Sequence, residues 1–209
     1  MSKWNSLLVF FLGLALASPC TLKAAGQTVH MQFKGLAADA DFDTLDPSGC
    51  IETMVTLIAV NGSIKQDGGP VAASSVFVFI SQANNCTQTQ LILADEGVPL
   101  SPGALTIDSS LKAATLKATV NVTDLVSNTS LPVAISLTWT GSGQLANFED
   151  HSNVRQPALS FKSTMRESGT FRPATATGSI SLNDANLMSG ASTGAELSSA
   201  KQGEVDISH

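Results

Sequence analysis

The chain has 209 residues, of which 43% are hydrophobic, 13% charged and 5% aromatic. That length suits one mid-sized domain, and charged residues are about half as frequent as the roughly 25% usual in globular chains. The hydrophobic content is too high, and the net charge of −6 too low, for an intrinsically disordered chain. We therefore expect a folded domain whose polar surface comes mainly from Ser, Thr, Asn and Gly.

Residues 1–25 have the pattern of a secretory signal peptide. A basic residue precedes an apolar run of 11 residues, which is shorter than the roughly 20 residues that a membrane-spanning helix needs. Small residues then predict cleavage after Ala24 or Ala25, with Ala17 as the alternative site. We expect a secreted or periplasmic domain over 26–209, with no membrane span in the mature chain.

Charge narrows the choice of partner. Loss of residues 1–25 leaves 9 basic and 17 acidic residues, a net charge of −8. Nucleic acids and anionic lipids attract clustered Lys and Arg, so an acidic chain is repelled by both. These two classes are excluded as general partners, and an extracellular or periplasmic partner is expected.

The mature chain reads as short strands separated by turn residues. Apolar and polar side chains alternate most clearly over 115–126 and 131–140, and the second of these places Trp139 on the apolar face. Alternation or apolar runs of β-branched residues predict strands over 29–34, 50–60, 75–81, 87–94, 104–107, 115–126, 131–140, 159–166 and 175–182.

Turn chemistry sets the expected ends of several strands. Asn61-Gly62 is a strong hairpin signal, and Asp95-Glu96-Gly97 and Gly68-Gly69-Pro70 are also typical of turns. Residues 144–157 and 183–194 are expected to be loops. Over 195–208 a hairpin around Gln202-Gly203 is favoured, with a short capped helix as the alternative.

Eight to ten short strands with turns every 8–15 residues predict an all-β fold. We expect a single antiparallel β-sandwich, jelly-roll or Ig-like, over 26–209, with a segment rich in small residues from about 183 onward.

The cysteines predict one disulfide. Cleavage after Ala24 or Ala25 removes Cys20 and leaves Cys50 and Cys86 in an oxidising compartment. Two reversals of the chain between them would bring both to the same end of the sandwich. The alternative is two buried free thiols.

An acidic cluster is the one candidate metal site. Asp39, Asp41 and Asp43 alternate along the chain, and Asp46 follows. Carboxylates at this spacing can supply the oxygen ligands that Ca²⁺ prefers, but the Gly and Glu of a helix-loop-helix calcium loop are missing. The favoured interpretation is a strand whose Asp side chains face water, so no metal ligand is assigned.

Catalytic signals are weak. The string Gly190 to Gly194 matches G-x-S-x-G around Ser192, but no strand-turn-helix context surrounds it. Glu149, Asp150 and His151 form the best acid–base group in the expected 144–157 loop, where a solvated loop tip also explains them. Lys162 and Arg166, on one strand face, could bind an anion or simply pair with acids such as Glu167.

The sequence therefore predicts a non-catalytic exported domain with a binding, adhesion or structural role and no cofactor. Its ligand is not identified. The alternative is a secreted hydrolase or lyase on a jelly-roll scaffold, using Glu149, Asp150 or His151.

Overall fold

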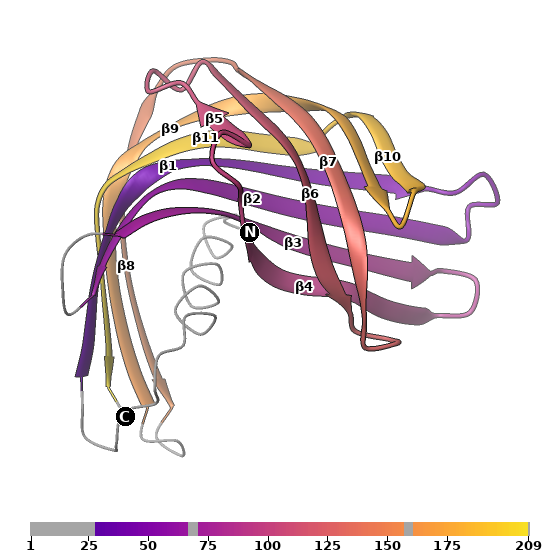
Figure 1. The fold of residues 1–209 in the computed structure, drawn as a ribbon, viewed down its shortest axis with the longest axis horizontal. Helices are drawn as coiled ribbons and strands as arrows, with labels where there is room; N and C mark the ends of the chain where they lie inside the picture. The colour runs from indigo at the N-terminus through magenta and orange to yellow at the C-terminus, as the bar shows by residue number, and fades with distance from the viewer. Residues whose placement is uncertain (1–27, 67–70, 157–160, 209) are drawn as a thin grey trace.

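The computed structural model describes residues 28–66, 71–156 and 161–208, so the predicted signal peptide and the Gly68-Gly69-Pro70 turn lie outside it. Figure 1 shows a single strongly curved sheet of long strands. Within these ranges, no helix has the length and apolar character needed to cross a membrane.

The described chain forms eleven strands. They are β1 (Thr28–Leu45), β2 (Ile51–Gln66), β3 (Val71–Asn84), β4 (Thr89–Pro99), β5 (Leu105–Ile107), β6 (Ala113–Asp124), β7 (Thr129–Gly141), β8 (Ala146–Gln156), β9 (Phe161–Leu182), β10 (Ala185–Ala191) and β11 (Gly194–Ser208).

All pairings are antiparallel, in the order β4-β3-β2-β1-β11-β9-β7-β6-β5. The N-terminal strands β1 to β4 form one meander, and β5, β6, β7 and β9 form the other part of the sheet. The last strand, β11, lies between β1 and β9 and joins the two parts. Strand β9 is long enough to pair with β8 along its first half and with β7 and β10 along its second.

The all-β, antiparallel prediction is confirmed, but the two-sheet sandwich is not, because every strand belongs to one sheet. That sheet curls until β4 approaches β6. At this seam Leu125 N–H donates to the Leu93 carbonyl at 3.1 Å. The Glu96 carboxylate accepts from the backbone N–H of Thr123 and, at 3.4 Å, from its hydroxyl. The Glu96 carboxylate thus takes the place of the backbone carbonyl that would accept from Thr123 if β4 and β6 were regularly paired strands.

The curled part of the sheet, here called the roll, encloses the main core. Trp139 is fully buried there, as its position in the alternating pattern predicted. Its indole N–H crosses the core and donates to the Asp39 carbonyl of β1 at 2.7 Å, which satisfies the one polar atom of this side chain. Other core residues from both parts of the sheet include Ala38, Phe42, Val55, Leu57, Val78, Ile80, Leu116, Val120, Ile135, Leu137 and Ile180.

Three predicted turns are wrong. Asn61-Gly62 lies inside β2, Asp95-Glu96-Gly97 lies inside β4, and Gln202-Gly203 lies inside β11, which is one strand and neither a hairpin nor a helix. A β-bulge next to Gln202 explains its turn-like chemistry, because residues that favour reversals also favour bulges.

Two predicted loops are also wrong. Residues 144–157 contain β8, a polar strand that pairs only with β9 among the described strands, and residues 183–194 contain β10. The strands expected over 159–166 and 175–182 are parts of the single strand β9. Strand β8 is exposed to water on one face and along one edge, so its sequence lacks the apolar alternation from which a strand is predicted.

A row of small residues crosses the sheet where the roll gives way to a second region, here called the arm. In register from β3 to β9, the row is Ala73, Gly62, Gly35, Ala200 and Gly169, and it ends against Phe148 of β8. A bulge on β11 after Ala200 shifts its register against both β1 and β9 beside this row. The arm contains β8 and the parts of β1, β9 and β11 beyond this row, and Figure 1 shows these strands curving away from the roll.

Glycine is required at the centre of this row. A Cβ on Gly35 would lie 2.7 Å from both the Asn61 carbonyl oxygen and the Gly62 Cα, closer than real Cβ contacts. On β9, Gly169 lies under the ring of its cross-strand neighbour Phe148. Side chains at these positions would force the strands apart, so the bend depends on their absence.

Gly35→Ala should therefore destabilise the fold, by about 1–3 kcal/mol, because the added methyl meets backbone that has little room to move. The matched control is Gly97→Ala on β4, where a Cβ would meet nothing within 4 Å. Urea unfolding of the two variants measures the difference. Equal midpoints would contradict the close-approach role of Gly35.

Candidate functional site

One end of the roll gathers four turns and is called the loop end. These turns join β1 to β2, β3 to β4, β6 to β7 and β9 to β10, and Figure 1 shows them on the same side of the molecule. Cys50 and Cys86 lie in the first two turns at disulfide distance, with their Cα atoms 5.2 Å apart. The prediction that both cysteines meet at one end of the domain is confirmed.

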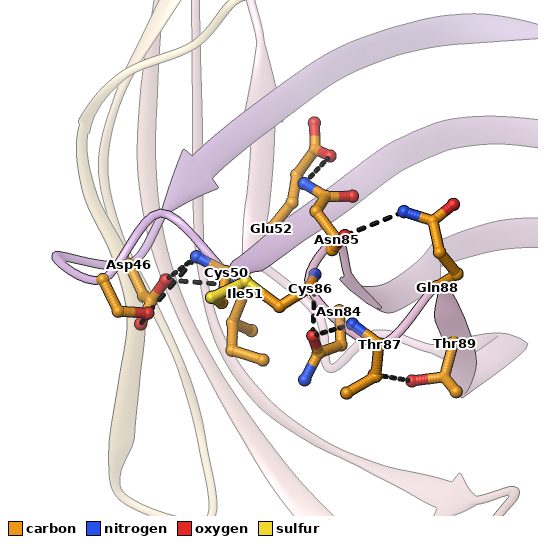
Figure 2. Close-up of a disulfide and its surroundings, with 11 residues drawn as sticks. Asp46, Cys50, Ile51, Glu52, Asn84, Asn85, Cys86, Thr87, Gln88 and Thr89 are labelled. Carbon is orange, nitrogen blue, oxygen red and sulfur yellow. Dashed lines mark hydrogen bonds between the residues drawn. A yellow bond between two sulfur atoms is a disulfide. The ribbon is translucent and has the colours of Figure 1, made fainter.

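Side-chain caps fix the two linked turns (Figure 2). The Asp46 carboxylate accepts from the backbone N–H groups of Cys50 and Ile51 at 2.9 and 2.8 Å, and from the Ser48 hydroxyl at 2.6 Å. The Ser48 hydroxyl and these backbone donors hold the pKa of Asp46 below its usual value. In the partner turn the Asn84 side chain accepts from the backbone of both Cys86 and Thr87 at 3.0 Å.

The loop end also carries a group of exposed apolar side chains, here called the apolar tip. It consists of Leu91 and Ile92 on β4 and Leu125 and Val126 in the β6–β7 turn, and these side chains are 43–61% exposed. The hydrogen bond from Leu125 to Leu93 holds the turn against β4. Leu91 and Ile92 are consecutive on β4, so the tip carries apolar side chains on both faces of that strand. Exposed apolar groups near one end of a domain are typical of contact surfaces.

The predicted acidic cluster is divided between a strand and a turn. Asp39, Asp41 and Asp43 occupy alternate positions on β1, with Ala40 and Phe42 buried on the other face. Asp43 is exposed, but Asp39 and Asp41 are half-buried, so the expectation that all three side chains face water is met only in part. Asp41 accepts from the Thr56 hydroxyl at 2.8 Å. Burial, and then repulsion by Glu52, raise the pKa of Asp43.

Asp46 lies in the turn between β1 and β2, where its carboxylate accepts hydrogen bonds from backbone N–H groups. Among the described residues, no three His, Cys, Asp or Glu side chains lie close enough together to hold a metal ion. Calcium binding by this segment stays a prediction.

The predicted acid–base group does not converge. Glu149, Asp150 and His151 are consecutive on β8, so the exposed Glu149 and His151 lie on the face opposite Asp150. Ser192 does not resemble a nucleophile either. It lies between β10 and β11, where its backbone and hydroxyl bond the backbone of Ala176 at 2.7 and 3.0 Å. His209 lies outside the described residues.

One buried titratable side chain, Glu167, is not predicted from the sequence. Glu167 of β9 is only 6% exposed, while its neighbour Arg166 on the other face is exposed. Burial, and then the facing carboxylate of Asp150 on β8, raise the pKa of Glu167 to about 7. The signal lay in the alternation, because Glu167 continues the apolar face of Met165 and therefore points away from water.

Compared with known protein families, curated proteins and solved structures, the chain shows no significant match to any. The site must therefore be interpreted from its own geometry.

Replacing both bridging cysteines by serine should lower the free energy of unfolding by about 4 kcal/mol on the loop-entropy model, since residues 50 to 86 then form an open loop in the unfolded chain. Urea unfolding of the oxidised protein and of the double variant measures this difference. If the oxidised protein and the double variant unfold at the same urea concentration, the cysteine pair does not stabilise the loop end.

Glu167 should make stability depend on pH. Its folded pKa of about 7 lies above its ordinary value of 4.5, so between these pH values the folded state holds a proton that the unfolded state has lost. Its contribution is present below pH 4.5 and is lost as pH rises through 7, by up to about 3 kcal/mol. Glu167→Gln should remove this loss and be more stable than wild type at pH 8.

The control is Glu149→Gln, an exposed acid on the neighbouring strand. Urea unfolding at pH 5 and pH 8 should give wild-type behaviour for it. An unchanged pH dependence in Glu167→Gln would show that Glu167 is ionised in the folded protein at neutral pH.

Proposed function

We propose that this protein is an exported, non-catalytic β domain whose loop end binds a partner, in an adhesion or structural role. The observation that carries the proposal is the apolar tip, because four exposed apolar side chains stand beside two turns fixed by hydrogen bonds and by the cysteine pair. A rigid apolar surface loses little conformational entropy on binding, which favours contact with another macromolecule.

Two features support export. The pattern over 1–25 is typical of a signal peptide, and a cysteine pair at disulfide distance is typical of an oxidising compartment such as the periplasm or the cell exterior. The curled sheet encloses a core between its two parts, as jelly-roll and Ig-like sandwiches do, and such domains carry binding loops at one end.

The second candidate, a secreted hydrolase or lyase, retains one favourable observation. Asp150 and Glu167 are cross-strand neighbours, and a carboxyl with a raised pKa beside a second carboxylate is a common acid–base arrangement. Release of sugar ends from polysaccharides by wild type, lost in Glu167→Gln, would support this candidate over the non-catalytic one.

Site-specific crosslinking tests the binding role. A photoreactive amino acid replaces Val126 in the apolar tip and, as a matched control, Val71 at the start of β3, which is 68% exposed. In the cells that produce the protein, we expect a discrete crosslinked species from position 126 and none from position 71. Equal crosslinking at both positions, or none at 126, would contradict a binding surface at the loop end.

A further inference from the structure

Strands β1 and β11 alternate between apolar and polar positions where they run through the arm. Register aligns these positions across the two strands and onto β9, so apolar and polar rows follow each other along the arm. One polar row contains Gln32, Glu204 and Arg166. The apolar rows contain Val29 with Ile207, Met31 with Val205 and Met165, and Phe33. Such alternation is typical of a sheet with one face in water and the other packed against a second layer.

The described residues supply no second layer on this face. All described strands belong to one sheet, and Figure 1 shows the arm as a single layer of them. Met165 and Phe33 nevertheless have the low exposure of core side chains, 4% and 6% in the full chain. Neighbours in the same sheet flank such side chains without lying over them, so the arm has the pattern of one half of a two-layer core.

Removal of the predicted signal peptide limits what the chain itself can place over this face. Outside the described ranges, the sequence then keeps residues 26–27, 67–70, 157–160 and 209. Four residues span at most about 14 Å. The arm is roughly 20 Å wide, because neighbouring strands lie about 4.8 Å apart. None of these segments is long enough to form the missing layer.

A second copy of the arm has the size and chemistry of that layer. Its own apolar face needs the same cover, so the contact satisfies both copies at once. Two faces of about 500 Å² each would bury about 1,000 Å² in total, at the lower limit for a specific interface.

The bend decides how two arms can meet. Phe33 of the arm lines one hollow together with Ala37 and Val60 of the roll. The roll therefore rises at one end of the arm, on the side of its apolar face. Two arms can lie face to face only if they point in opposite directions, so that each roll lies beyond the tip of the other arm.

This direction also separates the acids of the two copies. Glu167 lies in the row of Phe33, next to the bend, and faces Asp150 on β8. When the arms point in opposite directions about the Met165 row, the position of Glu167 in one copy lies across from that of Ser163 in the other. Arms pointing in the same direction would place carboxylates across from carboxylates, which is unfavourable.

We propose that the exported protein forms a dimer in which the apolar faces of two arms pack together and the arms point in opposite directions. The dimer rests on the predicted removal of residues 1–25. It is independent of the partner proposed for the loop end.

The test uses the exported, oxidised protein, whose N-terminus is determined by mass spectrometry. Sedimentation equilibrium between about 1 and 100 µM should show twice the mass of one chain at the higher concentrations, since interfaces of this size are weak. Met165→Glu should weaken the dimer at least about a hundredfold, because the contact would bury two added carboxylates. Thr164→Glu, which adds the same charge at a position of the polar face, should form the dimer as wild type does.

A second measurement does not depend on the folding of a charged variant. A photoreactive diazirine analogue of methionine at position 165 should join two copies through peptides that both contain residue 165. The same group at position 166, where the exposed Arg166 lies on the polar face, should join none. If a thermal melt finds Met165→Glu unfolded, this crosslink decides.

Three results would overturn the dimer. They are the mass of one chain at every concentration, a dimer that persists in folded Met165→Glu, and crosslinks from position 165 to a different protein. An exported chain that retains residues 1–25 would overturn it as well, because the face is then not left to a second copy.

Discussion

The close approach of β1 and β2 at Gly35 and Gly62 is the constraint on which the shape of the molecule depends. A sheet of this width needs curvature to bury one face, and a flat sheet would leave both parts of the main core exposed. One bulge on β11 and a row of small residues concentrate that curvature across five strands. The roll can then close against itself at β4 and β6, and the arm leaves in another direction.

The same row explains why polar chemistry collects at the bend. Where side chains are absent, larger neighbours enclose the space beside the row, so Glu167 is only 6% exposed, and the buried Ser75 hydroxyl has no hydrogen-bond partner. At the loop end the opposite holds. There Asp46 and Asn84 cap the β1–β2 and β3–β4 turns, and the apolar tip stays exposed. The bend thus buries polar side chains, whereas the loop end exposes apolar ones.

Sequence alone predicts the features that depend on local pattern. Alternation identified β6 and β7 and placed Trp139 in the core, and the spacing of Cys50 and Cys86 brought both to one end. Prediction from the sequence fails where the role of a residue depends on a partner that is distant along the chain. Asn61-Gly62 resembles a hairpin turn, but Gly62 is needed because Gly35 opposes it. The polar β8 resembles a loop because its only described partner is β9. Glu167 is a partial exception, because its alternation with the buried Met165 predicts the face on which it lies, whereas its pairing with Asp150 on β8 does not follow from the sequence.

The position of β11 has a consequence for the order of events after synthesis. Strand β11, the last of the described strands, lies at the centre of the sheet, paired with β1 on one side and β9 on the other, so contacts between residues about 170 positions apart must form before the sheet is continuous. Long-range antiparallel pairing of this kind is slow. During synthesis the β1–β4 meander can form early, yet the sheet cannot be completed until β11 has emerged. Such delayed completion would suit the export that we propose, because a chain crosses a membrane more readily while it is unfolded.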